Sequence, residues 1–197
     1  MMGDPRVLFG ILSLVALAAA VLPYFIGIAR GTIKPHMFSW LLWTLTMGIT
    51  GIAQWSQGAG PGAWAMLAGA ALNLVVVALA IRYGEKHITR SDWIMLTAGL
   101  CAIPLWFFTH DPLWSVILVT SIDIAGYGPT FRKAWSRPQE EGAMLFVLST
   151  GWTLASLFAM HDRALVNVLA PTAYAAANIA LVSYLIIRRR ALGISRI

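Results

Sequence analysis

Residues 7–29 read VLFGILSLVALAAAVLPYFIGIA, an apolar stretch without a charged side chain. A helix of about 20 such residues is long enough to cross the roughly 30 Å hydrocarbon layer of a membrane. A cleavable signal peptide is the alternative, since residues 18–20 are three alanines that resemble a cleavage site. The apolar core of a signal peptide is normally about 7 to 15 residues long. The stretch therefore predicts a membrane-spanning helix that stays in the protein.

Six further apolar blocks of similar length follow the first. Of the 197 residues, 59% are hydrophobic and 11% are charged, whereas a soluble domain carries about 25% charged residues. Only one of the blocks contains a charge, at Asp123. The predicted spans are 7–29, 37–57, 61–81, 93–109, 112–131, 143–160 and 164–187. The sequence therefore predicts an all-α integral membrane protein with seven transmembrane helices.

The net charge of +6 is distributed unevenly between the loops. Only Arg6 and Arg163 lie on the side of the N-terminus. The remaining Lys and Arg residues follow spans one, three, five and seven: Arg30, Lys34, Arg82, Lys86, Arg90, Arg132, Lys133, Arg137, Arg188, Arg189, Arg190 and Arg196. Because basic loops stay in the cytoplasm, we expect an outside N-terminus and a cytoplasmic C-terminus in a bacterial inner membrane. The charge is thus explained by topology, and no nucleic-acid partner is predicted.

The first three spans and the last three spans share a pattern of residues. Each triplet has a proline near the inner end of its first helix, then a Trp-Thr-Leu sequence, then an asparagine. These residues are Pro23, Trp43 and Asn73 in the first triplet, and Pro129, Trp152 and Asn178 in the second. The fourth span restores the starting side between two parallel repeats. We therefore predict a 3+1+3 arrangement, with a first repeat at residues 1–83, a linker helix at 84–110 and a second repeat with a basic tail at 111–197.

These features resemble the SWEET and PQ-loop superfamily of seven-helix carriers over nearly the whole chain. The resemblance lies in Pro23 within LPYFIGIARGTIKPHMFSW, Pro129 within GYGPTFRKAWSRPQEE, the basic loops that follow, and Asn73 and Asn178. The family's Pro-Gln pair is Pro-Tyr and Pro-Thr at these two prolines, while the literal Pro138-Gln139 lies in a loop. The resemblance implies a carrier that works by alternating access, with Asn73 and Asn178 lining the substrate pocket.

Asp123 is the one carboxylate within a predicted span. A charge near the centre of a helix costs about 2.5 to 3.5 kcal/mol on insertion scales, so Asp123 should face the interior of the bundle. Counting from Pro112 places it about 16 Å deep, near the midplane, and Tyr127 lies on the same helix face. Asp123 could bind a cation or cationic substrate, or take up a proton. The alternative is a hydrogen bond that ties two helices together.

The asparagine and tryptophan pairs are further candidates for substrate contact. The amides of Asn73 and Asn178 suit a hydroxylated solute, or they connect helices as packing residues. Trp43 and Trp152 could contact a sugar face or a ring, whereas most tryptophans in membrane proteins anchor the interface or fill the core. Both interpretations remain open for each pair.

The prolines and the single cysteine have structural interpretations as well. Pro23 and Pro129 each free a backbone carbonyl, which favours a hinge or a static kink. Cys101 can form no intramolecular disulfide, and in mid-span we expect it to pack as a small residue.

Common enzyme and cofactor motifs are missing from the sequence. The four histidines lack ligand spacing, so no metal site or cofactor is predicted, and neither a phosphate loop nor a nucleophile elbow occurs. We predict a carrier, not an enzyme, for a sugar-like or amino-acid-like solute, driven by its gradient or coupled to protons through Asp123. A vitamin or nucleoside carrier of the nicotinamide-riboside type, or a receptor or accessory protein with the same fold, is the alternative. The expected partners are the solute and the lipid bilayer, and homo-oligomerisation is left open.

Overall fold

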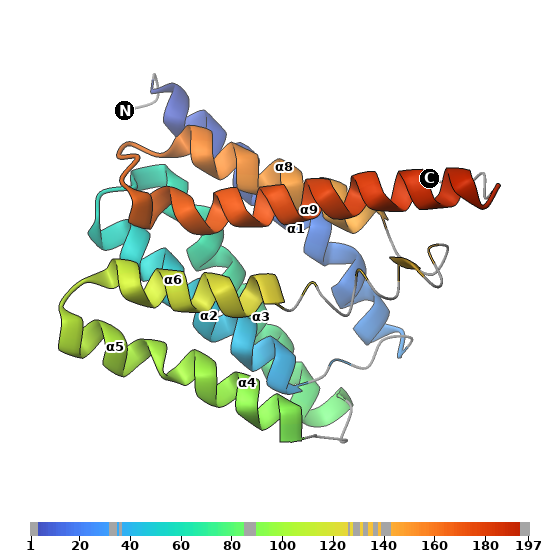
Figure 1. Cartoon of the computed structure of the whole chain (residues 1–197), viewed down its shortest axis with the longest axis horizontal. Helices are drawn as coiled ribbons and strands as arrows, with labels where there is room; N and C mark the ends of the chain where they lie inside the picture. The colour runs from blue at the N-terminus through green and yellow to red at the C-terminus, as the bar shows by residue number, and fades with distance from the viewer. Residues whose placement is uncertain are drawn as a thin grey trace.

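Every regular element in the described part of the chain is helical. The computed structural model describes residues 4–31, 35, 37–84, 90–125, 127, 131, 134–135, 138 and 143–193. Its elements are α1 (Pro5–Ala29), α2 (Met37–Ser56), the 3-10 helix η1 (Gly60–Ala63), α3 (Trp64–Tyr83), α4 (Arg90–Leu100), α5 (Ala102–Thr109), α6 (Pro112–Ala125), α8 (Ala143–Ala159) and α9 (Leu165–Ala191), as Figure 1 shows. The predicted all-α fold class is confirmed.

Three helical segments are long and apolar enough to cross a membrane. They are Pro5–Ala29, Gly60–Tyr83 and Leu165–Ala191, while α6, α8 and residues Leu96–Thr109 are apolar but shorter. The 20-residue α2 is of spanning length, but Thr44, Thr46, Thr50 and Gln54 make it more polar. By length and composition, these candidate spans are compatible with a membrane location.

The fourth predicted span is interrupted at Cys101, where α4 ends and α5 begins. Pro104 explains the interruption, because it has no N–H to donate to the carbonyl of Leu100 four residues earlier. Cys101, which we expect from the sequence to pack as a small residue in mid-span, is exposed in the structure. The fifth span was predicted to run to Phe131. α6 ends at Ala125, and residues 126 and 128–130 lie outside the described part of the chain.

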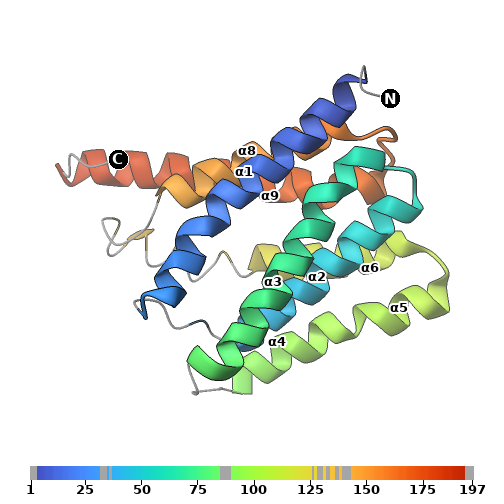
Figure 2. The ribbon, with the colours of Figure 1, turned by 180° about the vertical axis from the view of Figure 1, so that it is seen from behind.

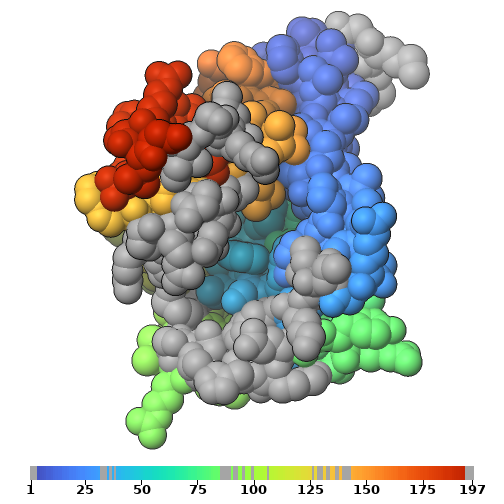
Figure 3. Space-filling model, turned by 90° about the vertical axis from the view of Figure 1, so that its right-hand side faces the viewer, coloured from blue at the N-terminus to red at the C-terminus, as the bar shows by residue number. Residues whose placement is uncertain are grey.

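The helices run back and forth between two ends of the bundle (Figure 1). The N-terminal end carries the start of α1 and the turns before η1, α6 and α9. Two contacts hold it together: the His161 N–H donates to the Ala59 carbonyl at 3.0 Å, and His161 pairs with Asp4 at 3.3 Å. The C-terminal end, seen in Figure 3, carries the end of α9 and the start of α8. Of the basic residues that the structure describes, this second end carries Arg30, Arg82, Arg90, Arg188, Arg189 and Arg190.

Helix packing brings together elements that are distant in the sequence. α3 packs against α1 and α2, while α9 packs against α6 and α8. α1 also packs along α8, and α2 packs along α6 (Figures 1 and 2). The main core cluster contains Leu17, Met66, Val116, Trp152 and Tyr174, which come from five different helices.

The N-terminal end is closed by close approach of η1 to the chain around residue 160. A Cβ on Gly62 would lie 2.3 Å from Cγ of Met160 and 3.0 Å from the carbonyl oxygen of Ser156. Gly60, with φ of +60°, lies against the ring of His161. Residue 62 must therefore be glycine because a larger side chain would clash. Glycine is favoured at residue 60 because the backbone there has a positive φ.

Candidate functional site

Two hydrogen bonds connect α9 to Asp123 of α6 and to Tyr127, which follows α6 in the sequence. The Tyr174 hydroxyl donates to Oδ2 of Asp123 at 2.5 Å, and the Tyr127 hydroxyl donates to Oδ1 of Asn178 at 2.7 Å. Asp123 and Tyr127 are one turn apart beside α9, and Tyr174 and Asn178 are one turn apart on α9. The structure thus brings together three of the predicted site residues, Asp123, Tyr127 and Asn178.

Asp123 points into the bundle, as its cost in lipid predicts. Thr46 of α2, which is fully buried, lies against the same carboxyl group. The Thr46 hydroxyl also donates a long hydrogen bond of 3.3 Å to the Trp43 carbonyl. Oδ1 of Asp123 is buried and has no hydrogen-bond partner among the described residues. The carboxyl group therefore sits where α2, α6 and α9 meet, with one oxygen bonded and one available.

A second polar contact joins α2 to the start of α9. Nε2 of Gln54 donates to the backbone carbonyl of Asn167 at 2.7 Å. Pro171 explains why this carbonyl is available, because the residue four positions later would normally donate its N–H to it. The Asn167 side chain donates in turn to the Gln57 carbonyl at 3.2 Å and to Oδ2 of Asp162 at 3.1 Å. The amide of Gln54 thus replaces the hydrogen bond that the proline removes.

Among the described residues, Asn73 makes no hydrogen bond to Asp123, Tyr127, Tyr174 or Asn178 and bonds to a different helix. Its side chain is buried on α3, and Nδ2 donates to the sulfur of Met47 at 3.4 Å. This contact connects α3 to α2, while Asn178 is bonded to Tyr127. A pocket lined jointly by Asn73 and Asn178 stays a prediction.

The two candidate tryptophans occupy different environments. Trp43 is 43% exposed and makes an edge contact with Trp40, whose indole nitrogen donates to the Tyr24 hydroxyl at 3.0 Å. Trp152 is only 8% exposed and lies in the same core cluster as Tyr174. Of the pair, Trp152 is therefore the one that lies with the interior residues.

The predicted hinges are described in part. α1 continues as a helix through Pro23 to Ala29, and the Pro23 side chain is exposed. Pro129 lies outside the described residues. Hinge motion at either proline stays a prediction.

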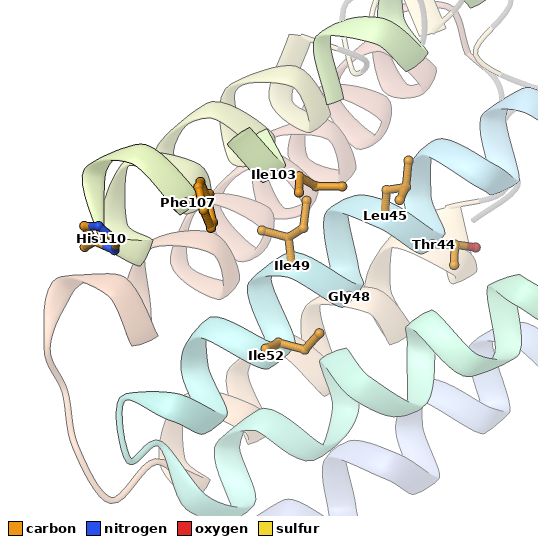
Figure 4. Close-up of a pocket in the computed structure, with 8 residues that line it drawn as sticks. All are labelled: Thr44, Leu45, Gly48, Ile49, Ile52, Ile103, Phe107 and His110. Atoms are coloured by element: carbon orange, nitrogen blue, oxygen red, sulfur yellow. The ribbon is translucent and has the colours of Figure 1, made fainter. Parts of the chain in front are cut away.

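Two cavities lie between pairs of helices. One of about 620 Å³ opens between α2 and α5, where mainly apolar residues and His110 line it (Figure 4). Another, of about 630 Å³, lies between the α6 side and α9, and its lining includes Tyr127 and Phe131. Neither of these two cavities is lined by Asp123 or Asn73.

The charged residues at the N-terminal end form a separate feature. Asp4 caps α1, and its Oδ1 accepts a 2.9 Å hydrogen bond from the Arg6 N–H. This backbone hydrogen bond, together with the contact to His161, lowers the pKa of Asp4 below its ordinary value of 3.8. Within the described residues, no three His, Cys, Asp or Glu side chains gather in a group that could hold a metal.

Sequence reasoning missed Tyr174, Asn167 and the polar residues of α2. The signal for α2 was the spacing of Thr46, Thr50 and Gln54, which recur every four residues and so share one helix face. Pro171 signals a carbonyl in need of a donor at Asn167. No protein-family model, no curated protein and no solved structure matches this chain.

Proposed function

We propose that the protein is a SWEET/PQ-loop-like carrier that moves a small polar solute, sugar-like or amino-acid-like, by alternating access. In this proposal the chain crosses a bacterial inner membrane seven times, and Asp123 takes up a proton during transport. The observation that carries the proposal is the cluster of Asp123, Tyr174, Tyr127 and Asn178, which places a carboxyl group in the interior of the bundle. Ionisable groups inside a membrane protein are rare and generally mark a transport path or a proton relay.

The helix packing supports two related halves. In α1 to α3 and again in α6 to α9, the third helix of the group packs against both of the others. The groups also meet reciprocally, since the first helix of each packs against the second helix of the other, as α1 does with α8 and α6 with α2. Two copies of one three-helix arrangement, connected by α4 and α5, are what a 3+1+3 carrier requires.

The distribution of charge supports the proposed orientation. The described basic residues gather at the C-terminal end of the bundle, apart from Arg6 and Arg163. Basic ends of transmembrane helices face the cytoplasm. The N-terminal end, closed around Gly62 and His161, would then face outside.

The chemistry of the cluster fits coupling between a proton and the solute. An ionised Asp123 accepts the hydrogen bond from Tyr174, whereas a protonated carboxyl group can also donate one. Protonation would therefore change the hydrogen bonds between α6 and α9, and with them the packing of one half against the other. Asn178 and Asn73 would offer amide groups to the solute.

A vitamin or nucleoside carrier remains a second candidate because Trp152 is buried in the core cluster with Tyr174. An indole in the interior offers a flat apolar face for a heterocyclic ring. The chemistry of the solute that is transported separates the two candidates.

The test is counterflow of labelled solutes into proteoliposomes, across a panel of sugars, amino acids, nucleosides and vitamins. It is run with and without an inward proton gradient. We expect saturable uptake that Asn73→Ala reduces, and a gradient dependence that Asp123→Asn removes. Ser121→Ala is the matched control on α6, since Ser121 is exposed and its hydroxyl bonds only to the Ile117 carbonyl of its own helix. Folded protein that moves no solute of the panel would contradict the carrier and favour a receptor.

A further inference from the structure

Five buried side-chain oxygens lack a hydrogen-bond partner within the described part of the chain. They are Oγ1 of Thr50, Oε1 of Gln54, Oγ1 of Thr120, Oδ1 of Asp123 and Oδ1 of Asn167. In folded proteins the large majority of buried polar side-chain atoms are bonded to protein or to ordered water. All five oxygens lie on α2, α6 and α9, the helices that meet at Asp123. Their concentration there calls for a partner that the described residues do not supply.

The five oxygens are ordered by depth along the bundle. Gln54 is two residues from the last residue of α2 and Asn167 is two residues from the first residue of α9. Both of these helix ends lie at the N-terminal end of the bundle, so both residues are about 3 Å deep. By the same rise per residue Thr50 lies about 9 Å deep, Thr120 about 12 Å and Asp123 about 16 Å. Successive positions therefore differ in depth by about 3 to 6 Å, a separation that one or two hydrogen-bonded water molecules span.

Contacts define the shallow and the deep end of this interface. At the shallow end the Gln54 side chain bonds to the backbone of Asn167, which joins α2 to α9. At the deep end Thr46 of α2 and Tyr174 of α9 both contact Asp123 of α6. The helix interface between these two points contains Thr50, one turn from both Thr46 and Gln54.

We propose that a file of water molecules occupies this interface from the N-terminal end to Asp123, and that protons reach Asp123 through it. The inference rests on the proposed proton coupling and adds the route by which protons reach Asp123. Asp162 lies at the mouth of the file, where it is exposed and accepts a hydrogen bond from Asn167. In each uptake a hydronium ion gives up one proton, an O–H bond forms at Oδ1 of Asp123, and neutral water remains. No electron transfer or other reactant is required.

The described side chains around Asp123 leave water as the route by which its carboxyl group exchanges protons. The groups that interact with its carboxyl group are Tyr174 from α9, Tyr127 beside α6 and Thr46 from α2. Two of these groups are titratable, and each is a hydroxyl that already donates to a fixed acceptor, Asp123 itself or Asn178. Threonine hydroxyls both donate and accept, so Thr50 and Thr120 can each hold a water on either side.

The test is infrared spectroscopy of the protein in lipid bilayers, which requires no transported solute. The carbonyl stretch of protonated Asp123 is identified by its loss in Asp123→Asn, and its hydrogen–deuterium exchange is timed after a change to D₂O. Thr50→Val and Thr120→Val keep the side-chain shape and remove hydroxyls that have no partner in the described structure. We expect each to slow exchange about tenfold, the effect of losing one hydrogen bond from the path. Thr44→Val is the control on α2, because the Thr44 hydroxyl bonds to the Trp40 carbonyl and its residue lines the α2–α5 cavity.

A second readout is the set of bands that shift in H₂¹⁸O, which report water held inside the protein. We expect such bands in the wild type and their loss in Thr50→Val and Thr120→Val. Absence of these bands in the wild type, or their displacement by added sodium ions, would overturn the water file. An Asp123 band that exchanges equally fast in all variants would also overturn it and leave the proposed carrier intact. Internal water without any Asp123 carbonyl band at any pH would instead contradict the proton role of Asp123.

Discussion

Asp123 accepts a hydrogen bond from Tyr174, and four residues further along both chain segments Asn178 accepts one from Tyr127. Each pair is separated by 51 residues in the sequence, so the two chain segments run parallel and in register. The bonds are reciprocal, because α9 provides the donor of the first pair and the acceptor of the second. Any sliding of one helix along the other would break both bonds at once.

The two tyrosines should differ in their contribution to stability. Tyr174→Phe removes the donor from a buried carboxyl group, which we expect to cost about 1 to 3 kcal/mol. Tyr127→Phe removes the donor to a neutral amide, and hydrogen bonds between membrane helices average about 0.6 kcal/mol. Unfolding of both variants in mixed micelles measures the difference. A smaller loss in Tyr174→Phe than in Tyr127→Phe would contradict this order.

The link between Gln54 and the Asn167 carbonyl should depend on Pro171. Gln54→Leu leaves a buried carbonyl without a donor, and we expect it to destabilise the protein by about 1 to 3 kcal/mol. Pro171→Ala restores a backbone N–H that can bond to the same carbonyl. In that background Gln54→Leu should therefore cost less, and a double-mutant cycle of unfolding free energies measures the coupling. Additive effects would show that the proline and the glutamine act independently.

Close packing at the N-terminal end should make Gly62 intolerant of a side chain. Gly62→Ala places a methyl group against Met160, and overpacking of this kind typically costs about 1 to 3 kcal/mol. Gly151→Ala is the control, because a Cβ there meets nothing within 4 Å and alanine favours a helix by up to about 1 kcal/mol. Thermal unfolding in detergent compares the two variants. In a double-mutant cycle Gly62→Ala should cost less in the Met160→Ala background than in the wild type, and an equal cost in both backgrounds would place the clash elsewhere.

Asp4 should stabilise the N-terminal end in a manner that depends on pH. Its pKa is lowered on folding, so its contribution is present above the ordinary value of 3.8 and is lost as the pH falls through the folded value. Asp4→Asn retains a capping side chain but loses the charge beside Arg6 and His161. We therefore expect this variant to unfold at a lower temperature than the wild type at pH 7, and at the same temperature below the folded pKa of Asp4. A difference that persists unchanged in acid would assign the effect to something other than the carboxylate.

Apolar stretch length predicted where most helices lie, because burial in lipid imposes a minimum length that is visible in the sequence. The observed bounds of α1, α2 and α8 differ from the predicted spans by only one or two residues at most ends. The interruption at Cys101 was missed, although Pro104 signals it. The exposure of Cys101 could not be inferred, because the direction in which a residue beside a helix break points depends on the packing of the neighbouring helices.

The candidate site was predicted in part for a similar reason. The cost of burying a charge identified Asp123 and predicted its inward orientation, and the helical repeat placed Tyr127 on the same face. Its partner Tyr174 was not predicted, because the register between α6 and α9 is set by packing and not by either segment alone. Gln54 and Asn167 were missed because their contact joins residues separated by 113 positions.

The length of α9 has a consequence for how the protein sits in its membrane. Its 27 residues extend about 40 Å, roughly 10 Å more than the hydrocarbon layer. In Figure 1 the helix extends past its neighbours at the C-terminal end, where Arg188, Arg189 and Arg190 form its last turn. Arg188 lies 4.1 Å from the ring centroid of Trp135, an amphipathic pair suited to lipid headgroups. In a thinner bilayer the hydrophobic mismatch of α9 would be relieved by tilt, and the packing of α9 against α6 and α8 would set the angle.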